Sequence, residues 1–150
     1  MIALVQRVKH ARVDVGDRTT GQILEGLLIL LGVHTSDTQE QALWLASKCA
    51  NLRIFPDEED KMNRSVIDHG GDVLVVSQFT LYGNAIKGNR PSFIESARPE
   101  VAEPLYEAFC EALSVHLGKK VQRGEFGAIM DVELCNWGPV TLHIEQRNSN

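Results

Sequence analysis

The chain has 150 residues, 43% hydrophobic and 23% charged, which is ordinary for a globular protein. A chain of this length is expected to form one domain and to bury about two-thirds of the surface that its unfolded form exposes. Its formal net charge of −5 argues against binding nucleic acid over the whole surface, although a local basic patch is compatible with it. Apolar runs are far shorter than the roughly 20 residues that cross a bilayer, and no signal peptide is indicated, so we expect a cytoplasmic protein without membrane contact.

The N-terminal part of the chain predicts three strands. Residues 2–8 and 11–15 alternate in hydrophobicity as strands do, and Gly16 with Asp17 signals a turn. Residues 26–33 form a continuous apolar run, which is typical of a strand buried on both faces.

An amphipathic helix is predicted next, at about 38–51. Ser36 and Gln39 have the spacing of a capping box ahead of it. Four residues share its apolar face and should cover a sheet: Ala42, Leu45, Ala46 and Cys49.

The second half predicts a central strand, a longer helix and two closing strands. The β-branched run at 73–79 suits the interior of a sheet. The helix begins at Pro99 and ends before Gly118. Its apolar residues at helical spacing are Val101, Leu105, Phe109, Ala112 and Leu113. Strands at 128–135 and 140–145 precede a polar tail at about 146–150, so the fold class is α/β with mixed or antiparallel sheets covered by two main helices.

The cysteines and histidines form no chemical pattern. Cys49, Cys110 and Cys135 are odd in number and embedded in apolar segments, which predicts reduced core residues. A cysteine nucleophile needs a basic partner, and none is identified beside them. The five histidines lack the spacing of metal ligands, and no G-x-G-x-x-G follows a strand, so neither a metal nor a nucleotide cofactor is indicated.

Two apolar runs end abruptly in polar groups, at 77–81 (Ser-Gln-Phe-Thr-Leu) and at 138–141 (Gly-Pro-Val-Thr). These segments resemble the two signature motifs of the D-aminoacyl-tRNA deacylases. Further landmarks of that family stand in the expected order at 1–8, 53–63 and 90–93. The resemblance spans roughly residues 1–145.

This resemblance implies a cofactor-independent homodimer with a barrel-like fold that hydrolyses the ester of D-aminoacyl-tRNA, and of glycyl-tRNA, at sites on the subunit interface. It also implies that Ser77, Gln78, Phe79 and Thr80 border the pocket for the terminal adenosine and the scissile ester. Met130 becomes a wall of that pocket, shaped by residues 124–128. In this family Gly138-Pro139 is a cis pair that projects into the partner's site and rejects L-amino acids.

The ester of an aminoacyl-tRNA is already activated, so positioning and oxyanion donors accelerate its hydrolysis without a strong nucleophile. Thr80 is the obvious nucleophile, but a Thr hydroxyl is weak without an adjacent base, and no base is identified. The Phe79 backbone amide is therefore preferred as oxyanion donor, and the family resemblance favours assistance by the ribose 2′-hydroxyl. The Phe79 ring is interpreted either as a core aromatic or as a stacking surface for adenine.

Several residues keep two interpretations. Without the resemblance, Gly138-Pro139 would be a plain turn, whereas a cis bond would turn two carbonyls toward an α-amino group. Arg7 is either a surface residue or a buried cation that bonds the carbonyls of the Gly-Pro segment. Two basic clusters are either solvated charges or tRNA contacts. They are Lys87, Arg90 and Arg98, and Lys119, Lys120 and Arg123.

Two positions depart from the family pattern, and two rival functions remain. Trp137 stands where many bacterial relatives carry Asp, and Asp60 replaces a common turn glycine. The rivals are a related editing hydrolase with a trans Gly-Pro that accepts L-aminoacyl-tRNA, and a non-catalytic dimeric RNA-binding module. Against the module, exposed aromatic and basic residues are not interleaved as single-strand binding requires.

Overall fold

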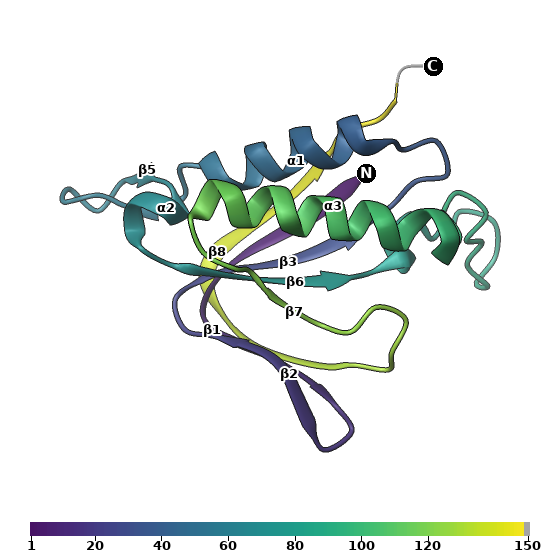
Figure 1. The fold of residues 1–150 in the computed structure, drawn as a ribbon, viewed down its shortest axis with the longest axis horizontal. Helices are drawn as coiled ribbons and strands as arrows, with labels where there is room; N and C mark the ends of the chain where they lie inside the picture. The colour runs from purple at the N-terminus through teal and green to yellow at the C-terminus, as the bar shows by residue number, and fades with distance from the viewer. Residues whose placement is uncertain (149–150) are drawn as a thin grey trace.

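The computed structural model describes residues 1–148, in which a curved sheet carries two long helices side by side on one face (Figure 1). The main sheet contains β1 (Ile2–Val15), β2 (Arg18–Ile23), β3 (Gly26–Gly32), β6 (Asp72–Ser77), β7 (Gln122–Arg123) and β8 (Asp131–Glu145). A separate small ribbon pairs β4 (Phe55–Pro56) with β5 (Met62–Arg64). The helices are α1 (Gln39–Asn51), α2 (Val66–His69), the 3₁₀ helix η1 (Phe79–Tyr82) and α3 (Pro99–Leu117).

The main sheet is mixed, as predicted, and β1 is its centre. β1 runs antiparallel to β2, β3 and β8, whereas β3 with β6 and β6 with β7 are parallel. The sheet curls until β2 approaches β7, which nearly closes a barrel. A Cβ atom on Gly21 would lie 2.7 Å from the carbonyl oxygen of Arg123, so this approach requires glycine.

The sheet is buried on both faces in its middle. Alternate residues of β3 and β6, such as Ile29 and Val75, pack under the helices. The residues between them, such as Leu28 and Leu74, fill the inside of the barrel. This double burial confirms the prediction for the apolar run at 26–33 and explains why β6 lacks polar alternation.

Both long helices lie where the sequence predicts them. The predicted apolar face of α1 is buried, and α3 ends at Gly118, which has a φ of 71°. Of the predicted apolar face of α3, Phe109 and Leu113 are fully buried and Leu105 and Ala112 pack against the core, whereas Val101 is 45% exposed and was wrongly included. Ala102, Tyr106 and Cys110 complete the buried face. No helix within residues 1–148 combines the length and apolar character needed to cross a membrane.

The capping box of α1 was assigned to the wrong pair of residues, although the helix itself begins where it was predicted. Its capping box is formed by Thr38 and Gln41, where the Thr38 N–H donates to the Gln41 side chain at 2.8 Å. Ser36 instead bonds the His34 ring, 2.8 Å away, with its hydroxyl. Both pairs have the same spacing, so the sequence alone does not separate them.

Several strand boundaries also differ from the predictions. The two predicted N-terminal strands are one strand, β1, and the two predicted C-terminal strands are one strand, β8, which starts only at Asp131. β6 ends at Ser77, because the chain enters η1 at Phe79. The polar tail is described as far as Asn148, and residues 149–150 lie outside the described part.

The cysteines are free thiols, but only two belong to the core. Cys49 and Cys110 are fully buried, and burial raises the pKa of each thiol to about 12. Both thiols therefore stay protonated at neutral pH. Cys135 is exposed on β8, so its prediction as a core residue was wrong, because an alternating strand with one solvated face places every second residue outside.

Candidate active site

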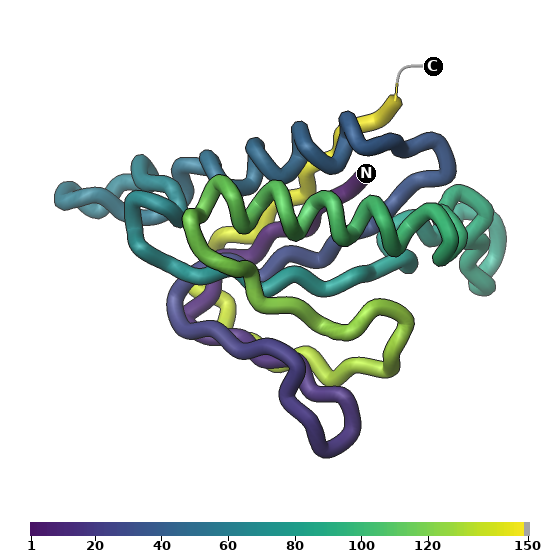
Figure 2. The backbone as a smooth tube through the Cα atoms, in the orientation of Figure 1, coloured from purple at the N-terminus to yellow at the C-terminus, as the bar shows by residue number. Residues whose placement is uncertain are grey.

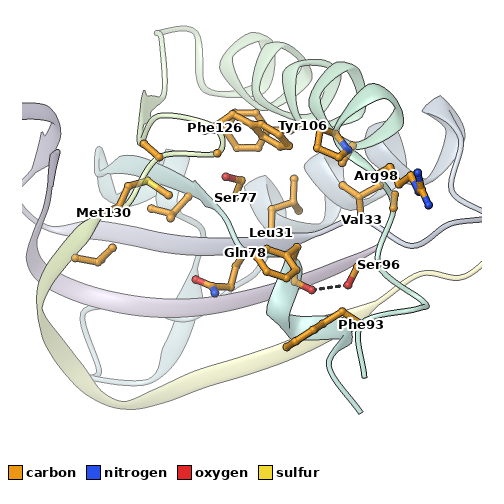
Figure 3. Close-up of a pocket in the computed structure, with 18 residues that line it drawn as sticks. Leu31, Val33, Ser77, Gln78, Phe93, Ser96, Arg98, Tyr106, Phe126 and Met130 are labelled. Carbon is orange, nitrogen blue, oxygen red and sulfur yellow. Dashed lines mark hydrogen bonds between the residues drawn. The ribbon is translucent and has the colours of Figure 1, made fainter. Parts of the chain in front are cut away.

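A cavity of about 540 Å³ lies where β3 and β6 end, beneath the N-terminal turns of α3 (Figure 3). Its floor is apolar and includes Leu31, Val76 and Tyr106. Ser77, Gln78, Phe79 and Met130 line it, so four of the predicted site residues meet at one place. Arg98 of the first basic cluster, Phe93 of the landmark at 90–93, and Phe126, Gly127 and Ala128 of the segment expected to shape the wall also line it. Residues that the sequence did not mark as part of the site complete the wall: Val33, Ser96, Ala97, Pro99, Ala102 and Val132.

The edge of the cavity is formed where β6 becomes η1. The Gln78 N–H donates to the Leu31 carbonyl at 2.8 Å, which keeps this residue beside β3. The first i to i−3 bond of η1 runs from the Leu81 N–H to the Gln78 carbonyl, at 3.2 Å. The amides of Phe79 and Thr80 come before that bond, so the helix supplies no acceptor for them. Of these two donors, the Phe79 N–H belongs to a residue that lines the cavity.

Aromatic and hydroxyl contacts fix this edge from the far side. The Phe79 ring is 58% exposed and packs edge-on against Phe93, with centroids 5.2 Å apart. The Ser96 hydroxyl donates to the Phe79 carbonyl at 2.7 Å (Figure 3). Because Phe79 is exposed, its interpretation as a core aromatic was wrong. Nothing in the sequence pairs Ser96 with Phe79, since the contact joins residues far apart in the chain.

Thr80 stands apart from the other three motif residues. Its side chain is exposed and accepts a hydrogen bond from the Gln78 amide. Thr80 is not among the residues that line the cavity, as far as residues 1–148 are described. The cavity wall also offers no base to activate Thr80. Among the described residues that line the cavity, Arg98 is the only one with a charged side chain. The Tyr106 hydroxyl donates to the Val75 carbonyl at 3.1 Å, and burial raises its pKa further above the ordinary value.

The opposite wall comes from the segment that leads into β8. The Phe126 ring lies 5.8 Å from the Tyr106 ring, centroid to centroid, and Met130 follows on the same side (Figure 3). A Cβ atom on Gly124 would lie 2.7 Å from the Met130 sulfur. The absence of a side chain at Gly124 thus leaves room for Met130 in the wall.

Gly138 and Pro139 lie outside this cavity, exposed on β8. Their peptide bond is cis. Gln6 pairs with Thr141 and Val8 with Asn136, so four residues of β8, from Trp137 to Val140, lie opposite Arg7 alone. The segment is a large bulge within a strand, and its interpretation as a plain turn was wrong.

Arg7 fills the space under this bulge. The side chain is buried, and its interpretation as a surface residue was wrong. Its Nη1 donates to the Ile54 carbonyl at 2.7 Å, and its Nε donates to the Trp137 carbonyl at 3.0 Å. Burial lowers the pKa of the guanidinium from its ordinary value. Arg7 was predicted to bond the carbonyls of Gly138 and Pro139. It instead bonds the carbonyl of Trp137, the residue just before Gly138.

The two basic clusters differ in their partners. Lys119 forms an ion pair with Asp72 at 2.8 Å, and Arg123 pairs with Glu107 and Glu111. Lys87 and Arg90 are exposed, and within residues 1–148 neither has an ion pair. Arg98 of the first cluster lines the cavity. The described residues contain no group of three or more metal-ligating side chains.

Asp60 adopts a backbone conformation that favours glycine. Asp60, which was noted in place of a turn glycine, has a φ of 63° in the loop between β4 and β5. The left-handed conformation explains why glycine suits this position.

Comparison with known proteins identifies relatives over nearly the full length. The family model for D-Tyr-tRNA(Tyr) deacylase matches residues 4–145. A D-aminoacyl-tRNA deacylase from Salinibacter ruber is 57% identical over 147 residues, covering 98% of this chain and 98% of that protein. A solved structure described as c-Myc DNA Unwinding Element Binding Protein is 40% identical with a TM-score of 0.91, covering 99% of this chain and 100% of that chain. Another, described as a probable eukaryotic D-amino acid tRNA deacylase, shares the fold with a TM-score of 0.83 at 18% identity, covering 95% and 97%.

Proposed function

The chain belongs to the D-Tyr-tRNA(Tyr) deacylase family, and on this premise we propose that it hydrolyses the ester of D-aminoacyl-tRNA to a free D-amino acid and tRNA. This makes it a hydrolase of translation proofreading. The observation that carries the proposal is the cavity edge at Phe79, whose backbone N–H has no acceptor within η1 and lies beside a mostly apolar wall. Such donors suit a reaction that develops negative charge on a carbonyl oxygen.

The chemistry follows from what the cavity wall offers. Water attacks the ester carbonyl, the carbonyl oxygen becomes an oxyanion, and the Phe79 N–H stabilises that charge. The oxyanion then collapses, the bond between the acyl carbon and the ribose oxygen breaks, and that oxygen takes up the proton that the water releases. The wall has no carboxylate or imidazole within the described residues, so in this proposal the neighbouring ribose 2′-hydroxyl relays the proton. Phe79 and Phe93 offer exposed ring surface on which the terminal adenine stacks. Met130 and Phe126 bound the opposite side.

Chiral selection is assigned to Gly138 and Pro139 of a partner subunit. In this proposal the enzyme is a cytoplasmic homodimer, and each exposed Gly-Pro bulge enters the partner's cavity. There its carbonyls accept hydrogen bonds from the substrate's α-amino group and its atoms obstruct an L side chain. Two observations support this arrangement: both residues are exposed, and neither lines the cavity of its own subunit. Glycyl-tRNA is a further substrate, because glycine has no side chain to obstruct.

The tRNA itself is expected to approach over the basic residues nearest to the cavity. Lys87, Arg90 and Arg98 carry charge that the described acidic residues do not neutralise through ion pairs. The net charge of −5 restricts phosphate contacts to such a patch. Arg98 also lies at the start of α3, where the helix dipole favours an anion.

The proposed function predicts rapid release of tyrosine from D-tyrosyl-tRNA and none above background from L-tyrosyl-tRNA. Purified protein is mixed with each ester in the presence of a chelator, and free amino acid is measured over time. Cleavage of both esters would indicate a relaxed editing hydrolase. If neither ester is cleaved while uncharged tRNA still binds, the protein is an RNA-binding module instead.

Replacement of Thr80 by alanine is expected to lower kcat for D-tyrosyl-tRNA by less than about fivefold, whereas loss of a covalent nucleophile costs on the order of 10⁶-fold. The reason is that the Thr80 hydroxyl is bonded to Gln78 and lies outside the cavity wall. Single-turnover hydrolysis checks this, with Ser77→Ala as the comparison inside the wall. A collapse of the rate in Thr80→Ala alone would establish Thr80 as nucleophile.

A further inference from the structure

Trp137 immediately precedes the exposed Gly138-Pro139 pair, and its ring is held from three other elements. Lys9 of β1 places its Nζ 3.6 Å from the ring centroid, and Arg7 places its Cζ 4.4 Å from it. Phe55 of β4 packs edge-on with centroids 6.0 Å apart, and His69 of α2 lies 5.7 Å away. A half-buried indole between cations and aromatic rings is favourably placed for cation–π attraction.

The groups around this ring are bonded to one another. Glu25 accepts from Lys9 at 3.4 Å and contacts the His69 ring nitrogen at 2.8 Å. His69 in turn stacks on Phe55, with centroids 4.6 Å apart. The hydrogen bond from His69 holds the pKa of Glu25 below its ordinary value, so the carboxylate stays ionised. Lys9 and His69 both contact the Trp137 ring, and Glu25 forms a hydrogen bond with each of them.

The register of β1 and β8 explains how Lys9 reaches the ring. Val8 pairs with Asn136 and His10 with Cys135, so Lys9 is an extra residue in β1. Side chains along a regular strand point alternately to the two faces of the sheet, and a bulge changes the direction in which one of them points. The two irregularities, one at Lys9 and one at Trp137 to Val140, lie next to each other in the β1 and β8 pair.

The Gly138-Pro139 pair is therefore exposed between two anchored residues. On one side, the Trp137 carbonyl is bonded by Arg7 and its ring is enclosed as described. On the other side, Val140 is 5% exposed and belongs to the core under the helices. Gly138 has no side chain of its own to hold the segment. The anchors must supply that restraint.

We infer that Trp137 is a positioning residue that fixes the direction in which Gly138-Pro139 leaves β8 and thereby sharpens discrimination between D- and L-aminoacyl-tRNA. The inference rests on the proposed function, because it concerns the same chiral selection. It acts through the geometry of the bulge, since the indole is packed on its own subunit and does not line the cavity within the described residues. Small displacements of a group that contacts the reacting atoms have large effects on rate.

The test compares kcat/KM for D-tyrosyl-tRNA and L-tyrosyl-tRNA in four proteins: the unaltered chain, Trp137→Ala, Trp137→Phe and Trp44→Ala. Trp137→Ala is expected to lower the D to L ratio about tenfold, chiefly by raising L cleavage, because a segment free to shift obstructs the L side chain less. Trp137→Phe keeps an aromatic ring between the cations and should restore the ratio to within about threefold. Trp44→Ala removes a partly exposed indole on α1 and should leave the ratio unchanged.

Lys9→Met provides a second arm if Trp137→Ala does not fold. It keeps Trp137 but removes one cation from the ring, and should lower the same ratio about threefold. In a Trp44→Phe background, where Trp137 is the single tryptophan, it should also increase quenching of the fluorescence by acrylamide. An unchanged ratio in folded Trp137→Ala, or in Lys9→Met when Trp137→Ala is unfolded, overturns the inference while leaving the proposed function in place. If the unaltered chain cleaves neither ester, the proposed function itself fails and the inference fails with it.

Discussion

Replacing Phe79 with proline is expected to lower kcat for D-tyrosyl-tRNA by about 10²-fold, the usual cost of removing one oxyanion donor. Proline removes the Phe79 N–H without a general break in the fold, because it is tolerated in the first turn of a helix. The preceding residue, Gln78, has φ −146° and ψ 82°, outside the helical region that a following proline disfavours. Single-turnover hydrolysis of the D ester measures the effect.

Phe79→Leu is the matched control, because it keeps the backbone donor and removes the aromatic ring. It should raise KM through lost stacking, by an amount on the order of 1–3 kcal/mol in binding, and leave kcat nearly unchanged. The pattern that contradicts the proposal is equal kcat in the proline and leucine variants. Oxyanion stabilisation would then come from a different group.

Replacing Arg7 with methionine is expected to lower the free energy of unfolding by about 3 kcal/mol, since each buried carbonyl left without a donor costs about 1–3 kcal/mol. The carbonyls of Ile54 and Trp137 both lose their partner, whereas methionine retains much of the apolar volume. Chemical denaturation gives the change. The D to L ratio should fall together with stability, because the Trp137 carbonyl is the backbone anchor of the Gly-Pro bulge.

Arg12→Met on the same strand is the control for Arg7→Met. Its side chain is 41% exposed and pairs with Asp14 and Glu133, contacts that contribute about 0–1 kcal/mol at a surface. If both variants lose the same small amount, the Arg7 bonds to the two carbonyls contribute little. Arg7→Lys separates charge from geometry, since lysine keeps the charge but lacks the planar fork that reaches two acceptors.

The sequence predicted elements whose signal is local. The run 26–33, both long helices and the stop at Gly118 follow from burial, periodicity and glycine conformation, and all four appear as expected. The family motifs also brought Ser77, Gln78, Phe79 and Met130 to one cavity. These features need no knowledge of what lies opposite them in space.

Features that depend on long-range partners were not predictable. β1 and β8 are each continuous through a bulge, because pairing across the sheet overrides the local break at Gly138-Pro139. Ser96 and Val33 line the cavity only because of how their segments pack. Cys135 looked buried because its neighbours are apolar, yet the outward face of β8 is set by the register with β1.

The pairing of β1 with β8 joins the first strand of the chain to the last, as the purple and yellow segments of the backbone trace show (Figure 2). Contacts so distant in sequence slow folding, because a long loop must close before the pairing stabilises the structure. During synthesis, β1 has no β8 to pair with until Asp131–Glu145 has been made. The sheet edge of β1 that pairs with β8 therefore stays open to other chains until then, and the Arg7 contact to Trp137 forms only after β8 has been made.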